Sequence, residues 1–224
     1  MNRAYPTTRR SLSRRLTAGI LGLGVIAALI AGTPASAAGP SPIPRLSHAL
    51  KGLTSYRVDV RVSSGKVSSS TLRIDVVRAG KSTSAHLTGT VTAASGTQTI
   101  DAVIVGSKVC VKIGNAAYRC ISNPQIAAQL NQDPSLSLTQ ASKTTTYRTV
   151  APVNFNHVSC DGYASKSTQG RVAVSSTLYI QHTTGRPCKV DVITSGKVSG
   201  VSANAETVAT WSLYNESLTI PRLK

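Results

Sequence analysis

Apolar and polar residues alternate with a period of two along five stretches in the first half of the chain. In the first stretch, Tyr56, Val58 and Val60 are separated by Arg57 and Asp59. This period places all apolar side chains of a stretch on one face, as in a half-buried β-strand. Clusters of Gly, Ser and Ala lie between the stretches, so they predict an antiparallel meander. The five stretches are Tyr56–Val62, Leu72–Val76, Leu87–Val91, Ile100–Ile104 and Val109–Ile113.

Two short segments have helical spacing instead. Leu46, Leu50 and Leu53 form one apolar stripe in the segment 45–54, and a second helix is predicted over 124–130, with a proline in its first turn. Further strands are predicted around 150–160, 171–181, 188–194, 203–213 and 218–220. Together these elements predict an α+β fold in which a large antiparallel sheet carries a few short helices.

The N-terminal segment has the three parts of a secretory signal peptide. Residues 1–15 contain five arginines and no acidic residue, residues 16–31 are apolar, and Ala35-Ser36-Ala37 offers a small-residue cleavage site. We therefore predict a signal peptide over 1–37, a Pro- and Gly-containing flexible linker over 38–44, and a single domain over 45–224. Residues 7–12 also match a twin-arginine signal weakly, which leaves the export route open. Because no cysteine follows the apolar run, the exported protein is expected to lack a lipid anchor.

The predicted mature chain remains strongly basic. The whole chain has a formal net charge of +17, and removal of the five arginines leaves 20 basic and 8 acidic residues, or +12. This excess favours anionic partners such as an envelope surface. The basic residues are dispersed and the mature chain has one Phe and one Trp, so the stacking platforms of nucleic-acid-binding proteins are missing and we expect no nucleic-acid partner.

Four cysteines lie in the exported part. If Gly114, Asn115 and Ala116 form a hairpin loop, Cys110 lies directly opposite Cys120. That pairing leaves Cys160 to pair with Cys188. An alternative is a zinc site in which His157 and His182 join Cys160 and Cys188. Because exported chains meet oxidants, the two disulfides are favoured over the metal.

The sequence gives little support to catalysis. It contains no G-x-S-x-G, H-E-x-x-H or Gly-rich phosphate-binding motif. Asp59, Asp75 and Asp101 lie between basic residues on polar strand faces, which is typical of cross-strand charge pairs. We therefore expect a protein that is not an enzyme and that needs no cofactor.

Several sequence segments resemble the lipoprotein-carrier superfamily (LolA/LolB-like), and in particular its LppX/LprG-like lipid-carrier branch. A leading helix is followed by Ser55-Tyr56-Arg57-Val58 and a meander that ends in VIVGSKVCVKIGNAAYRC (103–120). A T-G-x-P turn at 184–187 precedes a basic strand, and the chain closes on Tyr214-Asn215 with Ile220-Pro221.

This resemblance implies a strongly curved antiparallel sheet, a half-barrel, whose concave face is covered by short helices. An acyl-chain cavity would lie between the two layers. The chain would then be a secreted, non-catalytic carrier-like protein of the cell envelope that binds acyl lipid or lipoprotein acyl chains. The residues expected to line the cavity are Val58, Val60, Leu72, Ile74, Leu87, Ile104, Val111, Ile126 and Leu130.

A second function also fits the sequence. The basic surface would suit a secreted structural or adhesion module that holds polyanions of the cell wall. The same apolar faces could instead pack on each other in a filled core, because sequence patterns do not distinguish a packed core from a cavity.

Overall fold

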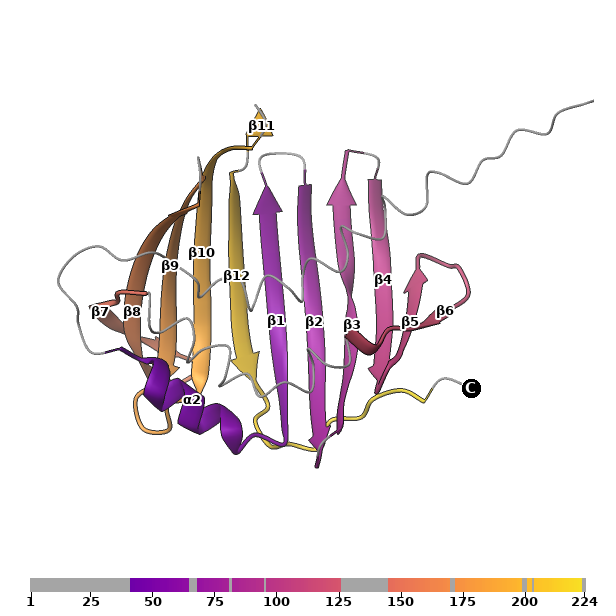
Figure 1. Ribbon diagram of the computed structural model, residues 1–224, viewed down its shortest axis with the longest axis horizontal. Coiled ribbons are helices and arrows are strands. Elements are labelled where there is room, and N and C mark those ends of the chain that lie inside the picture. The colour runs from indigo at the N-terminus through magenta and orange to yellow at the C-terminus, as the bar shows by residue number, and fades with distance from the viewer. Residues whose placement is uncertain are drawn as a thin grey trace, which may run out of the picture.

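The computed structural model describes residues 41–64, 68–80, 82–94, 96–125, 145–169, 172–198, 201–202 and 204–222. These residues form one short helix and a twelve-stranded antiparallel sheet that does not close on itself (Figure 1). The elements are α2 (Ile43–Lys51), β1 (Ser55–Ser64), β2 (Ser68–Ala79), β3 (Ser82–Ala93), β4 (Gly96–Val105), β5 (Lys108–Ile113), β6 (Arg119–Ser122), β7 (Arg148–Phe155), β8 (Val158–Gln169), β9 (Val172–Gln181), β10 (Pro187–Val198), β11 (Val201–Ser202) and β12 (Ala205–Ser212).

Two meanders build the sheet, and the last long strand joins them. The strand order is β6-β5-β4-β3-β2-β1-β12-β10-β9-β8-β7, with β11 paired to β10. Strand β12 pairs antiparallel with β1 on one side and with β10 on the other. Residues from the two ends of the domain therefore meet at the centre of the sheet.

The meander predicted from the alternating pattern is confirmed, and β1 to β5 contain all five stretches. The strand predicted around 150–160 is divided into two, because Asn156 and His157 adopt positive φ angles of 48° and 63° and separate β7 from β8. Residues 218–220 are not in a strand. Residues 1–40, with the predicted signal peptide, lie outside the described residues, as does most of the helix predicted over 124–130.

Helix α2 begins within the segment predicted as a flexible linker. It starts at Ile43, whose side chain is buried, and Pro44 occupies its first turn, where the missing N–H of proline costs no hydrogen bond. The Ser41 hydroxyl accepts a hydrogen bond from the backbone N–H of Ile43. The helix therefore begins before residue 45, where the single domain was predicted to start. No helix among the described residues is both long enough and apolar enough to cross a membrane.

One face of the sheet is apolar, and α2 lies on it. Directly opposed residues of an antiparallel pair share a face, and the pairs Val60–Ala209, Ala209–Val190 and Val190–Leu178 carry this face from β1 to β9. Helix α2 packs on the β8–β9 side, where its buried residues contact Tyr163, Leu178 and Ile180. The other part of the face, on β12 and β1 to β5, forms a separate buried cluster.

The opposite face is polar and carries ion pairs between neighbouring strands. Arg57 and Asp75 lie directly opposite one another and form two hydrogen bonds of 2.6 and 2.8 Å. Arg73 and Asp59 are also directly opposed, and the Arg73 side chain donates one hydrogen bond of 2.8 Å to the Asp59 carboxylate. The cross-strand charge pairs predicted from the sequence are therefore present.

Candidate ligand-binding face

Most of the residues predicted to line a cavity lie together on the apolar face. We call the cluster on β12 and β1 to β5 the apolar-face cluster. It contains Val58, Val60, Leu72, Ile74, Leu87 and Ile104 as buried members and Val111 as a partly buried neighbour. Each of these residues belongs to the alternating apolar positions of its strand. The pairing of the strands therefore places them side by side on one face of the sheet. The other two, Ile126 and Leu130, lie outside the described residues.

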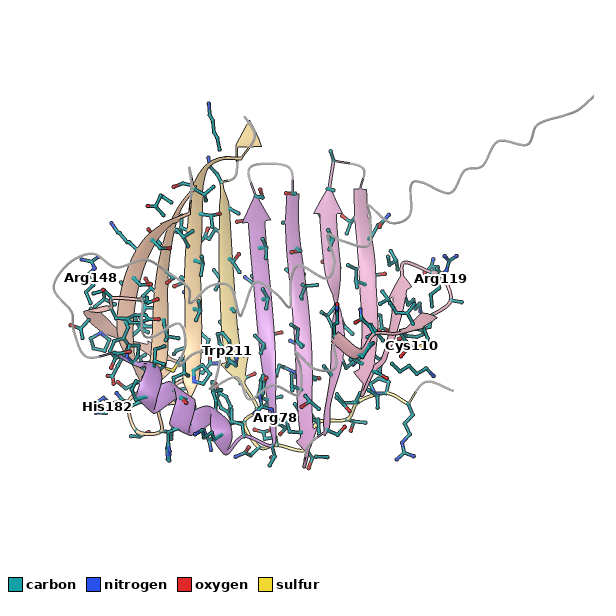
Figure 2. All side chains as sticks on the ribbon, viewed as in Figure 1. Arg78, Cys110, Arg119, Arg148, His182 and Trp211 are labelled. Carbon is teal, nitrogen blue, oxygen red and sulfur yellow. A yellow bond between two sulfur atoms is a disulfide. The ribbon has the colours of Figure 1, made fainter. Side chains whose placement is uncertain are left out.

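The cluster also contains residues that the sequence analysis did not select. They are Val76, Ala85, Ala102, Val109 and Ala209, with Tyr56, Val62, Ile100 and Trp211 packed against them. Val76, Ala102 and Val109 could have been selected, because they follow the same period of two. Ala209 and Trp211 could not have been selected from the sequence. Only the pairing of β12 with β1 places Ala209 opposite Val60 and Trp211 opposite Val58. Figure 2 shows Trp211 near the end of β12.

A cationic side chain marks the boundary between the cluster and the helix. The guanidinium of Arg78 lies 5.6 Å from the centre of the Tyr56 ring and donates a hydrogen bond of 3.2 Å to the Leu50 carbonyl. Burial raises the pKa of Tyr56, an effect that nearby Arg78 opposes. All buried members of the apolar-face cluster are aliphatic. The cluster therefore offers a surface suited to hydrocarbon, with the Arg78 guanidinium at its boundary with the helix.

The C-terminal segment holds the corner between α2 and β1. Asn215 has a positive φ of 59°, and its side-chain oxygen accepts a 2.8 Å hydrogen bond from the backbone N–H of Thr54. The Tyr214 hydroxyl donates to the carbonyl of Pro187, and Arg186 lies over the Tyr214 ring at 5.3 Å. Burial raises the pKa of Tyr214. Tyr214 and Asn215, which are part of the sequence similarity to the lipoprotein carriers, thus have a structural role in this corner.

Both predicted disulfides are present. Cys110 bonds to Cys120, which lies directly opposite it as the assumed hairpin loop required. Cys160 bonds to Cys188. Because all four thiols are oxidised, they cannot serve as thiolate ligands, and the zinc alternative is wrong. His157 lies in the β7–β8 turn, and His182 instead contacts Asp161.

The polar face carries a hollow of about 730 Å³ over β12, β1, β2 and β3. Asp59, Arg61, Arg73 and Thr88 line it, with Phe155 among the other contributors. Its Asp59 and Arg73 neutralise one another. The hollow is therefore weakly cationic, with Arg61 as the positive group that has no counterion among the described residues.

The chain matches none of the family models to which it was compared, and no curated protein matches its sequence.

Proposed function

We propose that this chain is a secreted, non-catalytic lipid- or lipoprotein-binding protein of the cell envelope, similar in its action to the lipoprotein carriers. The sheet would be a curved half-barrel covered by short helices, and acyl chains would lie between the two layers. The two disulfides support an oxidising, extracytoplasmic location.

The observation that carries this proposal is the extent of the apolar face. Eleven buried aliphatic residues on β12 and β1 to β5 form one cluster, and no residue of α2 belongs to it. Helix α2 packs on the neighbouring part of the face, next to β8 and β9. An acyl chain would need an aliphatic surface of this kind, free of fixed charge.

The energy of transfer of an acyl chain would be the main source of affinity. Each buried CH₂ group contributes about 0.8 kcal/mol, so twelve carbons would contribute roughly 10 kcal/mol before the costs of association. Micromolar binding requires about 8 kcal/mol. Acyl chains longer than twelve carbons would supply more, which offsets the costs of association.

The first test is to identify what the purified protein carries. We expect native mass spectrometry of the exported chain to show added mass that is released by organic solvent and identified as acyl lipid. A protein that is empty after mild purification and takes up no fluorescent fatty acid would contradict the proposal.

A single substitution distinguishes a cavity from a filled core. Ile104 is buried in the apolar-face cluster. If it lines a cavity, Ile104→Trp fills the cavity, blocks uptake of the fluorescent fatty acid and costs little stability. If it lies in a packed core, overpacking lowers the free energy of unfolding by about 1–3 kcal/mol, measured in urea. Ile193→Trp is the control, because Ile193 is 55% exposed on β10.

The alternative function, a wall-binding structural module, makes the opposite prediction. Such a protein would be free of lipid, and its retention on cell walls would fall steeply with added salt. The pairing of Arg57 with Asp75 and of Arg73 with Asp59 removes two cations from the polar face that this function would use. The lipid-binding function is therefore the better supported of the two.

A further inference from the structure

Exposed aliphatic residues gather at one end of the sheet together with basic residues. Among the described residues, three of the five most exposed large apolar side chains lie on β4, β5 and β6: Val105 at 50%, Ile113 at 36% and Ile121 at 56%. Lys108 and Arg119, on β5 and β6, are exposed, and Lys112 is half-buried. By register, Ile113, Arg119 and Ile121 lie on the apolar face, and Val105, Lys108 and Lys112 lie on the polar face, so the six residues border the edge of the sheet from both sides. We call these six residues the β5–β6 edge surface.

The apolar face runs without interruption into this surface. In one row, Ile104 and Val109 are 3% and 4% exposed, and the next residue outward, Ile121, is 56% exposed. In the neighbouring row, Val111 is followed by Arg119. The apolar surface therefore extends to the open edge of the sheet, where the Arg119 guanidinium lies on the same face.

The charges of the edge surface are available for a partner. Lys108 and Arg119 form no ion pair with any described residue, while the acidic group nearest in register, Asp101, is bonded to His86 at 3.0 Å. Lys112 lies 6.0 Å from the centre of the Tyr118 ring. Tyr118 is half-buried, and burial together with a hydrogen bond to Asp101 raises its pKa to about 12. It therefore stays neutral, as an interfacial aromatic residue does.

Another β-strand is a poor candidate for this edge. Strand β6 has four residues, and a disulfide ties its Cys120 to β5. Short edge strands that carry a positive charge discourage the addition of further strands. Aliphatic side chains interspersed with Lys and Arg instead match a surface of anionic lipid, where apolar groups enter the headgroup layer and cations bind the lipid charges.

We propose that the β5–β6 edge surface docks this protein on anionic lipid membranes, with the edge of the sheet towards the bilayer. Ile113, Ile121 and Val105 would enter the headgroup layer, and Lys108, Lys112 and Arg119 would contact the lipid phosphates. Ligand bound on the apolar face would then have a route along the row from Ile104 to Ile121 into the membrane. Only this route rests on the function proposed above; the docking does not.

The test measures cosedimentation of the mature protein with vesicles of phosphatidylcholine, with and without phosphatidylglycerol. We expect binding to the mixed vesicles, weakened by salt. Arg119→Gln should lower the partition coefficient about fivefold, because each cation near an anionic leaflet contributes about that factor. Ile121→Ser should lower it by about the same factor through lost apolar burial.

Two control variants have matched exposure at other places in the sheet. Ile193 on β10 is 55% exposed, against 56% for Ile121, so Ile193→Ser should leave the partition coefficient unchanged. Arg148 is exposed on β7, and Figure 2 shows it at the opposite end of the sheet from Arg119. Arg148→Gln should therefore also have no effect.

Equal effects of the test and control variants, or no binding to the mixed vesicles, would overturn the proposal. Binding to a soluble polyphosphate that competes with vesicles and is insensitive to Ile121→Ser would also overturn it, since a polyanion alone would then be the partner. Uptake of soluble fatty acid, measured without vesicles, reports on the carrier function separately. The edge variants should keep that uptake, and circular dichroism should show that they keep the fold.

Discussion

The guanidinium of Arg45 lies 3.0 Å from the carboxylate of Asp161 and connects residues that are 116 positions apart in the sequence. Arg45 belongs to α2 and Asp161 to β8. The second carboxylate oxygen contacts His182 Nδ1 at 2.9 Å, and Arg45 also donates to the His182 carbonyl at 2.6 Å. These contacts attach the helix to the turn between β9 and β10, which fixes where the helix lies on the apolar face.

The first prediction concerns the pH dependence of this contact. The hydrogen bond with His182, assisted by Arg45 and opposed by burial, holds the pKa of Asp161 below its ordinary value. A carboxyl group with a lowered folded-state pKa stabilises the fold above its unfolded pKa, and that stabilisation is lost as pH falls through the folded value. Asp161→Asn should therefore lower the free energy of unfolding by about 1–2 kcal/mol at neutral pH.

Urea titrations at several pH values check this prediction. The difference between the wild type and Asp161→Asn should shrink below about pH 4, where the unfolded carboxyl becomes protonated. Asp59→Asn is the control, since Asp59 pairs with Arg73 at the surface and should contribute less than about 1 kcal/mol. A difference that stays constant down to strongly acidic pH would contradict the assignment.

The second prediction concerns the close approach of β2 and β3. A Cβ atom added at Gly89 would lie 2.1 Å from the Thr71 carbonyl oxygen and 2.8 Å from a methyl group of Leu72. Because the first of these atoms is backbone, a side chain fits only if the strands move apart. Gly89→Ala should lower the free energy of unfolding by about 3 kcal/mol. Gly52→Ala, where a Cβ would meet no atom within 4 Å, should change it by less than about 1 kcal/mol.

Local patterns were sufficient to predict the first meander and the helix. The alternation of Val58 and Val60 with Arg57 and Asp59 depends on neighbours in sequence alone, and so does the register that places Cys110 opposite Cys120. The Asn156–His157 turn was missed because it lacks glycine, although asparagine is among the residues that tolerate its positive φ. The stretch around it therefore resembled one continuous strand.

Contacts between residues far apart in the sequence could not be predicted from the local pattern of apolar and polar residues. Nothing in residues 205–212 indicates that they lie between β1 and β10, so the contribution of Ala209 and Trp211 to the apolar face could not be foreseen. The same holds for the Asp161 contacts, which combine a helix, a strand and a turn. Pairing of distant strands is set by the whole sheet and not by a local period.

The third prediction distinguishes the two disulfides by their accessibility. Cys160 and Cys188 are 0% and 2% exposed, whereas Cys120 is exposed on the edge strand β6. A mild reductant should therefore reduce Cys110–Cys120 first, as shown by timed alkylation and peptide mapping. Replacing both cysteines of a pair by serine should cost about 3 kcal/mol for Cys110–Cys120 and about 3.5 kcal/mol for Cys160–Cys188, whose loop is longer. Simultaneous reduction of both bonds would contradict the order.

The last prediction separates the two roles of Asn215 in the corner formed by α2, β1 and the C-terminal segment. Its side-chain oxygen accepts hydrogen bonds from the backbone N–H and hydroxyl of Thr54, and its backbone N–H donates to the Ser55 carbonyl at 2.9 Å. Its positive φ of 59° would cost a residue such as alanine about 1–2 kcal/mol, but not glycine.

Three variants resolve these contributions. Asn215→Asp keeps the acceptor and tolerates the backbone conformation, so its free energy of unfolding should remain close to that of the wild type. Asn215→Gly loses only the acceptor and should cost about 1 kcal/mol. Asn215→Ala loses the acceptor and adds backbone strain, so it should cost about 2–3 kcal/mol. If the glycine and alanine variants were equally stable in urea, strain at this position would be negligible and the acceptor alone would hold the corner.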